Sequence, residues 1–150
     1  MEIRRLAAIY NVWDAVELLK YSMMSLENHV DVFIIVFQNI SNYGEQYAPL
    51  GDMDLQGFDY VLKLYTPEIG HGAKNETAKR NLGINTALDL GCTHFISMDC
   101  DEMYEDFGKA KQEYIDSGAD GSVCKMFTYF RRPTLKFENE DSYYVPFIHK

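Results

Sequence analysis

The stretch Val32-Phe33-Ile34-Ile35-Val36-Phe37 is an unbroken run of β-branched and aromatic residues. A strand that is apolar on both faces is typical of the middle of a parallel sheet, where helices cover both sides. A shorter apolar run, from Leu6 to Tyr10, precedes it, and a helical pattern of apolar residues lies between the two. These segments predict a strand-helix-strand unit at the start of the fold.

The alternation of strand and helix patterns continues along the rest of the chain. Further strands are predicted over residues 60–65, 94–98, 122–130 and 143–148, and helices over residues 75–90 and 107–117. A long polar loop is expected over residues 38–57. This order predicts the α/β class: a three-layer α/β/α sandwich with a mostly parallel, doubly wound sheet, in one domain spanning residues 1–150.

Several residues predict where the helices begin, end and face. The first helix is expected to begin at Asp14, because Glu17 follows it at the capping-box spacing. Asp106 is the expected N-cap of the third helix. Gly91 and Gly118 are expected to end the second and third helices. One face of the second helix carries Ala78, Leu82, Asn85 and Leu88.

Composition excludes several classes of protein. The chain has 150 residues, with 14 Lys and Arg against 23 Asp and Glu, so its formal net charge is −9. Such a chain is repelled by nucleic acids and by anionic membrane surfaces. No apolar run approaches the roughly 18 residues of a membrane span, and the N-terminal residues do not resemble a secretory signal. The three cysteines form no CxxC pair, so we expect a cytoplasmic protein without a disulfide framework.

Polar residues follow three of the predicted strands. They are Tyr10-Asn11, Gln38-Asn39 and Asp99-Cys100-Asp101. Ligands of doubly wound sheets bind at the carboxyl ends of the strands, so we expect a site there. Five of the eight residues from 99 to 106 are acidic. A divalent metal would relieve their repulsion, and Mg²⁺ or Mn²⁺ prefers one or two carboxylates together with substrate phosphates.

Two of these features have a purely structural alternative. Asp99 and Asp101 could cap the turn that follows them, and the remaining acids, Glu102 and Glu105 among them, are expected on a solvated face. Arg80, in the second helix, could bring its planar donor fork to a nucleotide's phosphates or base. Alternatively, Arg80 is a surface cation beside the acidic cluster.

Three segments together resemble the nucleotide-binding half of a family 2-type glycosyltransferase with the GT-A fold, which is Rossmann-like. They are Ala8-Ile9-Tyr10-Asn11 followed by Asp14, then Ala78-Lys79-Arg80-Asn81-Leu82-Gly83-Ile84, and then Phe95-Ile96-Ser97-Met98-Asp99-Cys100-Asp101. Their order and spacing match the family over roughly residues 5 to 104. Each element alone is a weak signal, whereas the ordered set is fairly specific.

The resemblance implies a role for each matched residue. Tyr10 and Asn11 would border the nucleotide base, and Arg80 would contact base or phosphate. Asp99 would lie toward the ribose and belong with Asp101 to the metal site, where Asp101 would hold the Mn²⁺ or Mg²⁺ that bridges the diphosphate. The family transfers a sugar from a nucleotide-diphosphate donor to a hydroxyl acceptor, with inversion, and the acceptor here would be an unknown glycan, lipid or protein.

Two departures from the family pattern bear on the substrate. Gln38-Asn39 stands where the family usually has an acidic pair that grips uracil. An amide such as that of Asn39 can still accept from a base N–H and can also donate, which leaves the identity of the base open. The family's catalytic base and acceptor region normally lie further along a longer chain, so we expect a truncated or reduced domain. The acids Glu138, Glu140 and Asp141 do not align with that base, and the catalytic residue stays unassigned.

Two other functions remain open. The same fold could serve as a non-catalytic nucleotide-sugar-binding or structural module. A nucleotidyltransferase shares the layout, but it would be expected to have a glycine-rich, basic loop directly after the first strand. The segment Asn11-Val12-Trp13-Asp14 does not provide such a loop. Donor binding without transfer would distinguish the module from the enzyme.

Overall fold

The computed structural model describes residues 2–46, 54–129, 137 and 144–150. Its strands are β1 (Leu6–Val12), β2 (Val32–Phe37), β3 (Tyr60–Leu64), β4 (His94–Met98), β5 (Gly121–Lys125) and β6 (Tyr144–His149). Its helices are α1 (Val16–Met24), α2 (Gly72–Asp89) and α3 (Phe107–Ser117). Within the described ranges, none of these helices has the length and apolar character needed to cross a membrane.

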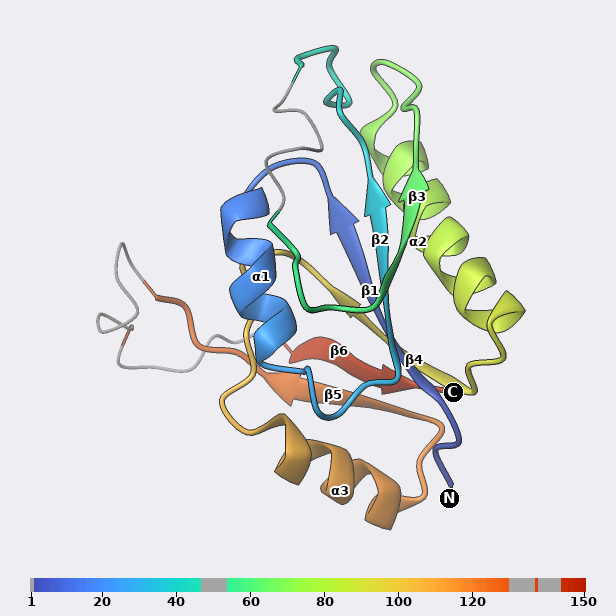
Figure 1. Ribbon diagram of the computed structural model, residues 1–150, viewed down its shortest axis with the longest axis vertical. Helices are drawn as coiled ribbons and strands as arrows, with labels where there is room; N and C mark the ends of the chain where they lie inside the picture. Colours follow the sequence, from blue (N-terminus) through green and yellow to red (C-terminus); the bar gives the residue numbers. More distant parts are fainter. Residues whose placement is uncertain (1, 47–53, 130–136, 138–143) are drawn as a thin grey trace.

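The strands form one six-stranded sheet in the order β3-β2-β1-β4-β6-β5 (Figure 1). Strands β1 to β4 are mutually parallel, while β6 is antiparallel to both β4 and β5. The chain moves outward from β1 to β3 and then crosses back through α2 to β4, on the other side of β1. The predicted doubly wound, mostly parallel sheet is therefore confirmed, with its topological switch point between β1 and β4.

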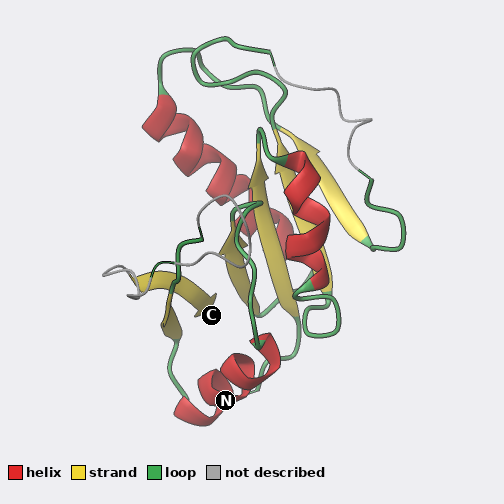
Figure 2. Ribbon diagram, turned by 90° about the vertical axis from the view of Figure 1, so that its left-hand side faces the viewer, coloured by secondary structure: helices red, strands yellow, loops and turns green. Residues whose placement is uncertain are grey.

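Helices cover both faces of the sheet, which Figure 2 shows from the side. Leu6, Ala8 and Tyr10 of β1 pack in one core with residues of α1 and α3. Ala7 and Ile9 point the other way, into a second core that includes Ala87 of α2. Because successive side chains of a strand alternate between faces, β1 and β2 must be apolar throughout, as the sequence pattern indicated.

The start of α1 differs from the prediction. The helix begins at Val16, and its N-cap is Ala15 in a left-handed conformation, with φ 54° and no side-chain cap. Asp14 is exposed, so the capping box predicted from Asp14 and Glu17 is wrong. The N-cap predicted for α3 is confirmed, because the Asp106 carboxylate accepts a hydrogen bond from the Lys109 N–H at 3.0 Å.

The buried face of α2 also differs from the expected apolar face. The buried residues of α2 are Asn75, Lys79, Gly83, Thr86 and Ala87. Leu88, by contrast, is 63% exposed. The helix lies close to the sheet at Gly83, where a Cβ atom would lie 2.3 Å from the Cγ2 of Ile9. This contact turns Asn75 and Lys79 inward at the carboxyl end of the sheet.

Candidate functional site at the carboxyl edge of the sheet

The carboxyl ends of β2, β1 and β4 lie side by side, as expected from the sequence. Asn11 of β1 pairs with Val36 of β2, and the Gln38 N–H donates to the Val12 carbonyl at 2.9 Å. On its other side, β1 pairs Tyr10 with Met98, the last residue of β4. The polar residues that follow these strands therefore meet at the switch point.

Two amide side chains at this edge have buried polar atoms that are incompletely paired. Gln38 is 2% exposed; its Nε2 donates to the Ile40 carbonyl at 3.0 Å, while its Oε1 has no hydrogen-bond partner in the described part of the chain. The Oδ1 and Nδ2 of Asn11 likewise lack partners there. Asn39 is exposed beside them. Leaving a buried polar group unpaired costs about 1–3 kcal/mol, so these amides indicate a place for a polar ligand.

Tyr10 lies on the opposite face of the sheet from Asn11. Its ring is fully buried, its hydroxyl lies 2.8 Å from the Ser22 hydroxyl, and burial raises the pKa of the phenol well above its usual range. The Ser22 hydroxyl in turn donates to the backbone carbonyl of Glu102. The contact between Tyr10 and a base stays a prediction. In this geometry only the backbone of Tyr10 could make that contact, because its side chain is buried on the other face.

The Asp-Cys-Asp segment follows β4 and presents both carboxylates outward. Asp99 and Asp101 are exposed, whereas Cys100 is buried, which raises the pKa of its thiol to about 12. Neither aspartate side chain accepts a hydrogen bond from the residues that the structure describes. The turn is held instead by Glu102, whose Oε2 accepts from the Asp99 N–H at 2.9 Å. The alternative in which Asp99 and Asp101 cap this turn therefore finds no support.

Arg80 is directed from α2 toward the end of β4. Its Nη1 donates to the Ser97 hydroxyl at 2.8 Å, and its Nε donates to the Glu76 carboxylate at 2.9 Å. The other oxygen of Glu76 lies 3.1 Å from the Lys79 ammonium. A pocket opens between α2 and the sheet at this point; its lining comprises Arg80, Ser97, Asp99, Glu102, Val145 and Pro146.

Loss of hydration at this pocket raises the pKa values of two acids. Partial loss of hydration raises the pKa of Asp99, as do the charges of Glu76 and Asp101, while Arg80 and Lys79 oppose the rise. Glu102 is half-buried, and its pKa is raised mainly by the same loss of hydration, with further contributions from Asp99 and Asp101. Both shifts mean that an added cation would be favourable here.

The metal predicted at Asp99 and Asp101 fits this chemistry. No three His, Cys, Asp or Glu side chains come close enough to hold a metal within the described ranges. Mg²⁺ and Mn²⁺ sites, however, commonly use only one or two carboxylates and take their remaining ligands from phosphates and water. Two free, mutually repelling carboxylates meet that requirement, and the metal site remains a candidate.

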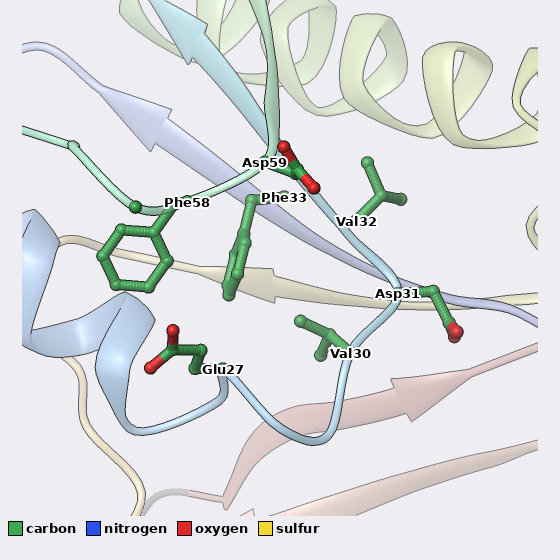
Figure 3. Close-up of a pocket in the computed structure, with 8 residues that line it drawn as sticks. Glu27, Val30, Asp31, Val32, Phe33, Phe58 and Asp59 are labelled. Carbon is green, nitrogen blue, oxygen red and sulfur yellow. The ribbon is translucent and has the colours of Figure 1, made fainter.

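A second pocket lies at the opposite end of the sheet (Figure 3). It is beside the beginning of β2, and its lining includes Glu27, Asp31, Phe33, Phe58 and Asp59. Asp31 has a structural task, because its carboxylate accepts from the Leu6 N–H at 2.7 Å. The amino end of a doubly wound sheet is not where such folds bind their ligands, so the candidate site is the carboxyl edge.

Several residues of the site were not predicted from the sequence as ligand contacts. Lys79 was not predicted as a buried residue, because a lysine inside a helix is ordinarily expected at the surface. Its spacing of three residues from Glu76 is a usable signal for an ion pair, but it says nothing about burial. Ser97 could have been found, since it lies two residues before Asp99 and therefore shares a strand face with it.

We expect the Asp99→Asn variant to be more stable than the wild-type protein at pH 7, measured by thermal unfolding in the presence of EDTA. A carboxyl group whose pKa is raised on folding holds its proton more tightly in the folded state. Its stabilising contribution is complete below the unfolded pKa and is lost as the pH rises through the folded pKa. The gain in Tm should therefore disappear near pH 3, below the ordinary aspartate pKa of about 3.9.

Asp116→Asn is the matched control for that measurement, since Asp116 is an exposed residue of α3 and the substitution removes the same charge. An equal gain in Tm for both variants would show that only the net charge matters. A gain at pH 7 confined to Asp99→Asn would identify a carboxylate that is kept at a cost to stability, which is typical of functional sites.

The fold defines a class: doubly wound α/β proteins, whose ligands generally bind at the switch point of the sheet. Among solved structures, that of 4-diphosphocytidyl-2C-methyl-D-erythritol synthase is similar to this chain. The TM-score is 0.53, with 13% sequence identity over 100% of this chain and 76% of that chain. At this identity the likeness shows a shared fold. No family model and no curated protein matches the sequence.

Proposed function

We propose that this chain binds a nucleotide-diphosphate sugar and acts as a metal-dependent, inverting glycosyltransferase toward a hydroxyl acceptor. One observation carries the proposal. The carboxylates of Asp99 and Asp101 follow the buried strand β4 and lack hydrogen bonds from the described residues, and Asp99 lies near the charge of Arg80 at the switch point. This is the arrangement that a metal-bound diphosphate requires.

Each residue of the site has a task in that function. Asp101 and Asp99 would hold Mn²⁺ or Mg²⁺, and the metal, when bound, would neutralise charge on the diphosphate. Arg80 is oriented by Glu76 and Ser97, so its guanidinium is ready to pair with a phosphate without further ordering. The acceptor hydroxyl needs a general base. The acids at 138, 140 and 141 lie outside the described residues, and we assign none of them.

A second candidate is transfer of a nucleotidyl group. The similar solved structure belongs to an enzyme that is named as the synthase of a diphosphocytidyl compound. Against this candidate stands the segment from Asn11 to Asp14, which contains neither glycine nor a basic residue. Release of pyrophosphate would favour this second candidate, whereas transfer of the sugar with release of a nucleoside diphosphate would favour the first.

The proposal is tested by isothermal titration of a panel of UDP-, GDP-, CDP- and ADP-sugars, each with and without Mn²⁺. We expect at least one donor to bind in a Mn²⁺-dependent manner. The Asp101→Asn variant should weaken that binding more than about tenfold, since even outer-shell partners of a metal contribute that much. Asp116→Asn should leave binding unchanged.

Two results would contradict the proposal. One is the absence of binding to every donor in the panel. The other is donor binding that Asp101→Asn does not weaken, because the donor would then bind without a metal held by Asp101. Binding without sugar release or transfer to any hydroxyl acceptor would instead favour the non-catalytic module.

A further inference from the structure

A third cavity, of about 190 Å³, lies between α2 and the sheet beside β4 and β6. Four elements supply its apolar lining: Ile9 from β1, Ile84 from α2, Phe95 from β4 and Pro146 from β6. A cavity of about 150 Å³ with walls of Leu, Ile and Phe is large enough to hold a benzene ring. This cavity can therefore hold one apolar ring of that size.

The described part of the chain covers the apolar walls of this cavity only in part. Ile84 and Phe95 are half-buried, and Pro146 is exposed. On the opposite face of β6, by contrast, Phe147 is buried against the ring of Phe107 in α3. One face of β6 is thus closed by α3, while the other presents open apolar surface beside α2. A ligand that covers such surface gains free energy by removing it from water.

The cavity adjoins the candidate donor site. Arg80, Ser97 and Pro146 line both this cavity and the pocket that contains Asp99 and Glu102. The Nη1 of Arg80 donates to the Ser97 hydroxyl at 2.8 Å, so these two side chains lie together where the two spaces meet. The spaces form one groove with an apolar end and a charged end. A molecule whose ring lies in the apolar end presents its polar substituent to the charged end.

The cavity lies on the side of the candidate site that the donor is not expected to occupy. The nucleotide base is expected at the ends of β1 and β2, and the diphosphate at Asp99 and Asp101. In the strand order β3-β2-β1-β4-β6-β5 the cavity extends toward β6, so the expected diphosphate separates it from the base. The reactant of the proposed transfer that still needs a place is the hydroxyl acceptor.

Two side chains of the lining favour an aromatic ring over an aliphatic group. The rings of Phe95 and His149 are stacked, with centroids 5.6 Å apart and an interplanar angle of 28°. The two residues are partners across β4 and β6, which holds the rings side by side. Contact with aromatic faces and edges favours a further aromatic ring beyond the area that it buries, by about three- to tenfold in affinity.

We propose that this cavity binds the aromatic ring of the acceptor, so that the substrate is an alcohol or phenol whose hydroxyl stands next to the ring. This inference rests on the proposed function, since it names the acceptor class of the same transfer. In that transfer the hydroxyl oxygen bonds to the anomeric carbon of the donor. The bond from that carbon to the diphosphate breaks, its electron pair leaves with the nucleoside diphosphate, and the hydroxyl proton passes to the general base and then to water.

Methyl NMR spectra of the isoleucine side chains test binding of the ring in the absence of a donor. We expect benzyl alcohol to shift the methyl signals of Ile9 and Ile84 in a saturable manner, whereas glycerol shifts neither. Butan-1-ol, an alcohol of similar hydrophobicity, should bind about threefold or more weakly than benzyl alcohol. Nuclear Overhauser effects between the ring protons of the ligand and the Ile84 methyl groups locate the ring directly.

The Ile84→Trp variant fills the cavity from α2 with a larger side chain. It should weaken binding of benzyl alcohol about tenfold or more, measured on the Ile9 methyl signals, because the ring loses its buried contacts. Its affinity for the nucleotide-sugar donor should change less than about twofold, since the donor lies outside the cavity. Leu88→Trp, one turn further along α2 at a position that is 63% exposed and outside the lining, is the matched control and should alter neither.

Sugar transfer then tests the ring as part of the acceptor. With Mn²⁺ and a donor identified by titration, benzyl alcohol should accept the sugar with a kcat/KM about tenfold or more above that of glycerol. Ile84→Trp should remove most of this advantage by raising the KM for benzyl alcohol, while Leu88→Trp should retain it.

Every result of these experiments bears on the inference. Unshifted isoleucine methyl signals, equal binding of butan-1-ol, or transfer to benzyl alcohol that Ile84→Trp does not impair would overturn the inference and leave the proposed function standing. Failure of every donor to bind would overturn the proposed function, and the acceptor assignment with it. If Ile84→Trp does not fold, the Overhauser contacts in wild-type protein decide: contacts with the Ile84 methyl groups support the inference, and their absence overturns it.

Discussion

The Asn75→Ala variant is expected to lose about 4 kcal/mol of unfolding free energy, at about 1 kcal/mol for each of four hydrogen bonds. The Oδ1 of Asn75 accepts from the Tyr65 hydroxyl at 3.0 Å and from the Glu68 N–H at 2.9 Å. Its Nδ2 donates to the Asn42 side chain at 2.9 Å and to the Glu68 carbonyl at 2.8 Å. Asn75 is fully buried, so water cannot replace the lost partners in place.

Asn75 joins three segments that flank the candidate site: the loop after β2, the end of β3, and the loop that leads into α2. Urea unfolding measures the loss of stability, and Asn85→Ala, at an exposed position of the same helix, is the matched control with an expected change near zero. Amide hydrogen exchange of Glu68 gives a second readout and should accelerate only in Asn75→Ala. A loss below about 1 kcal/mol would contradict the four-bond account.

Local patterns in the sequence predicted much of the fold. The bounds of β2, β4 and α3 are those expected from the apolar runs at 32–37 and 94–98 and from the helical spacing over 107–117. In these elements the spacing of the apolar residues in the sequence matches the pattern of buried side chains in the structure. The predicted start of α1 was wrong because the helix begins after Ala15, whose backbone is left-handed. The sequence carries no signal for that conformation.

The inward face of α2 could not be predicted from apolar spacing. Near the site this face is polar, since Asn75 and Lys79 are turned toward the sheet, and the contact that sets the rotation is between Gly83 and Ile9. Such a contact joins residues far apart in the chain. Hydrophobic periodicity finds helix faces that pack on apolar cores, and it fails where the buried face of a helix is polar.

The candidate site was predicted in outline. The strand ends and Arg80 come together as expected, because parallel neighbouring strands bring their carboxyl ends to one edge. The sequence also held an unused signal: adjacent residues of a strand face opposite sides, so Tyr10 and Asn11 could not both present side chains to one ligand. Only the structure reveals the unpaired amides of Asn11 and Gln38, because hydrogen-bond partners depend on tertiary contacts.

Replacing Gly83 by alanine should lower the unfolding free energy by about 2 kcal/mol, despite the better helix propensity of alanine. The new methyl group would lie 2.3 Å from the Cγ2 of Ile9, far inside contact distance. That methyl belongs to a buried β-branched side chain, which has little rotameric freedom to withdraw. Gly72→Ala is the matched control in the same helix, since its nearest neighbour would be the Asn42 amide nitrogen at an ordinary 3.7 Å.

The cause of that loss can be isolated by adding Ile9→Leu, which removes the obstructing Cγ2 at nearly constant volume. Ile9→Leu alone should cost less than about 1.5 kcal/mol. If the Cγ2 contact is responsible, the double variant should be more stable than the sum of the single changes by about 1 kcal/mol or more. Because Arg80 lies one turn from Gly83, displacement of α2 should also weaken the proposed nucleotide binding in Gly83→Ala, and the double variant should regain it. Strictly additive stabilities would instead mean that the helix, and not Ile9, resists the methyl group.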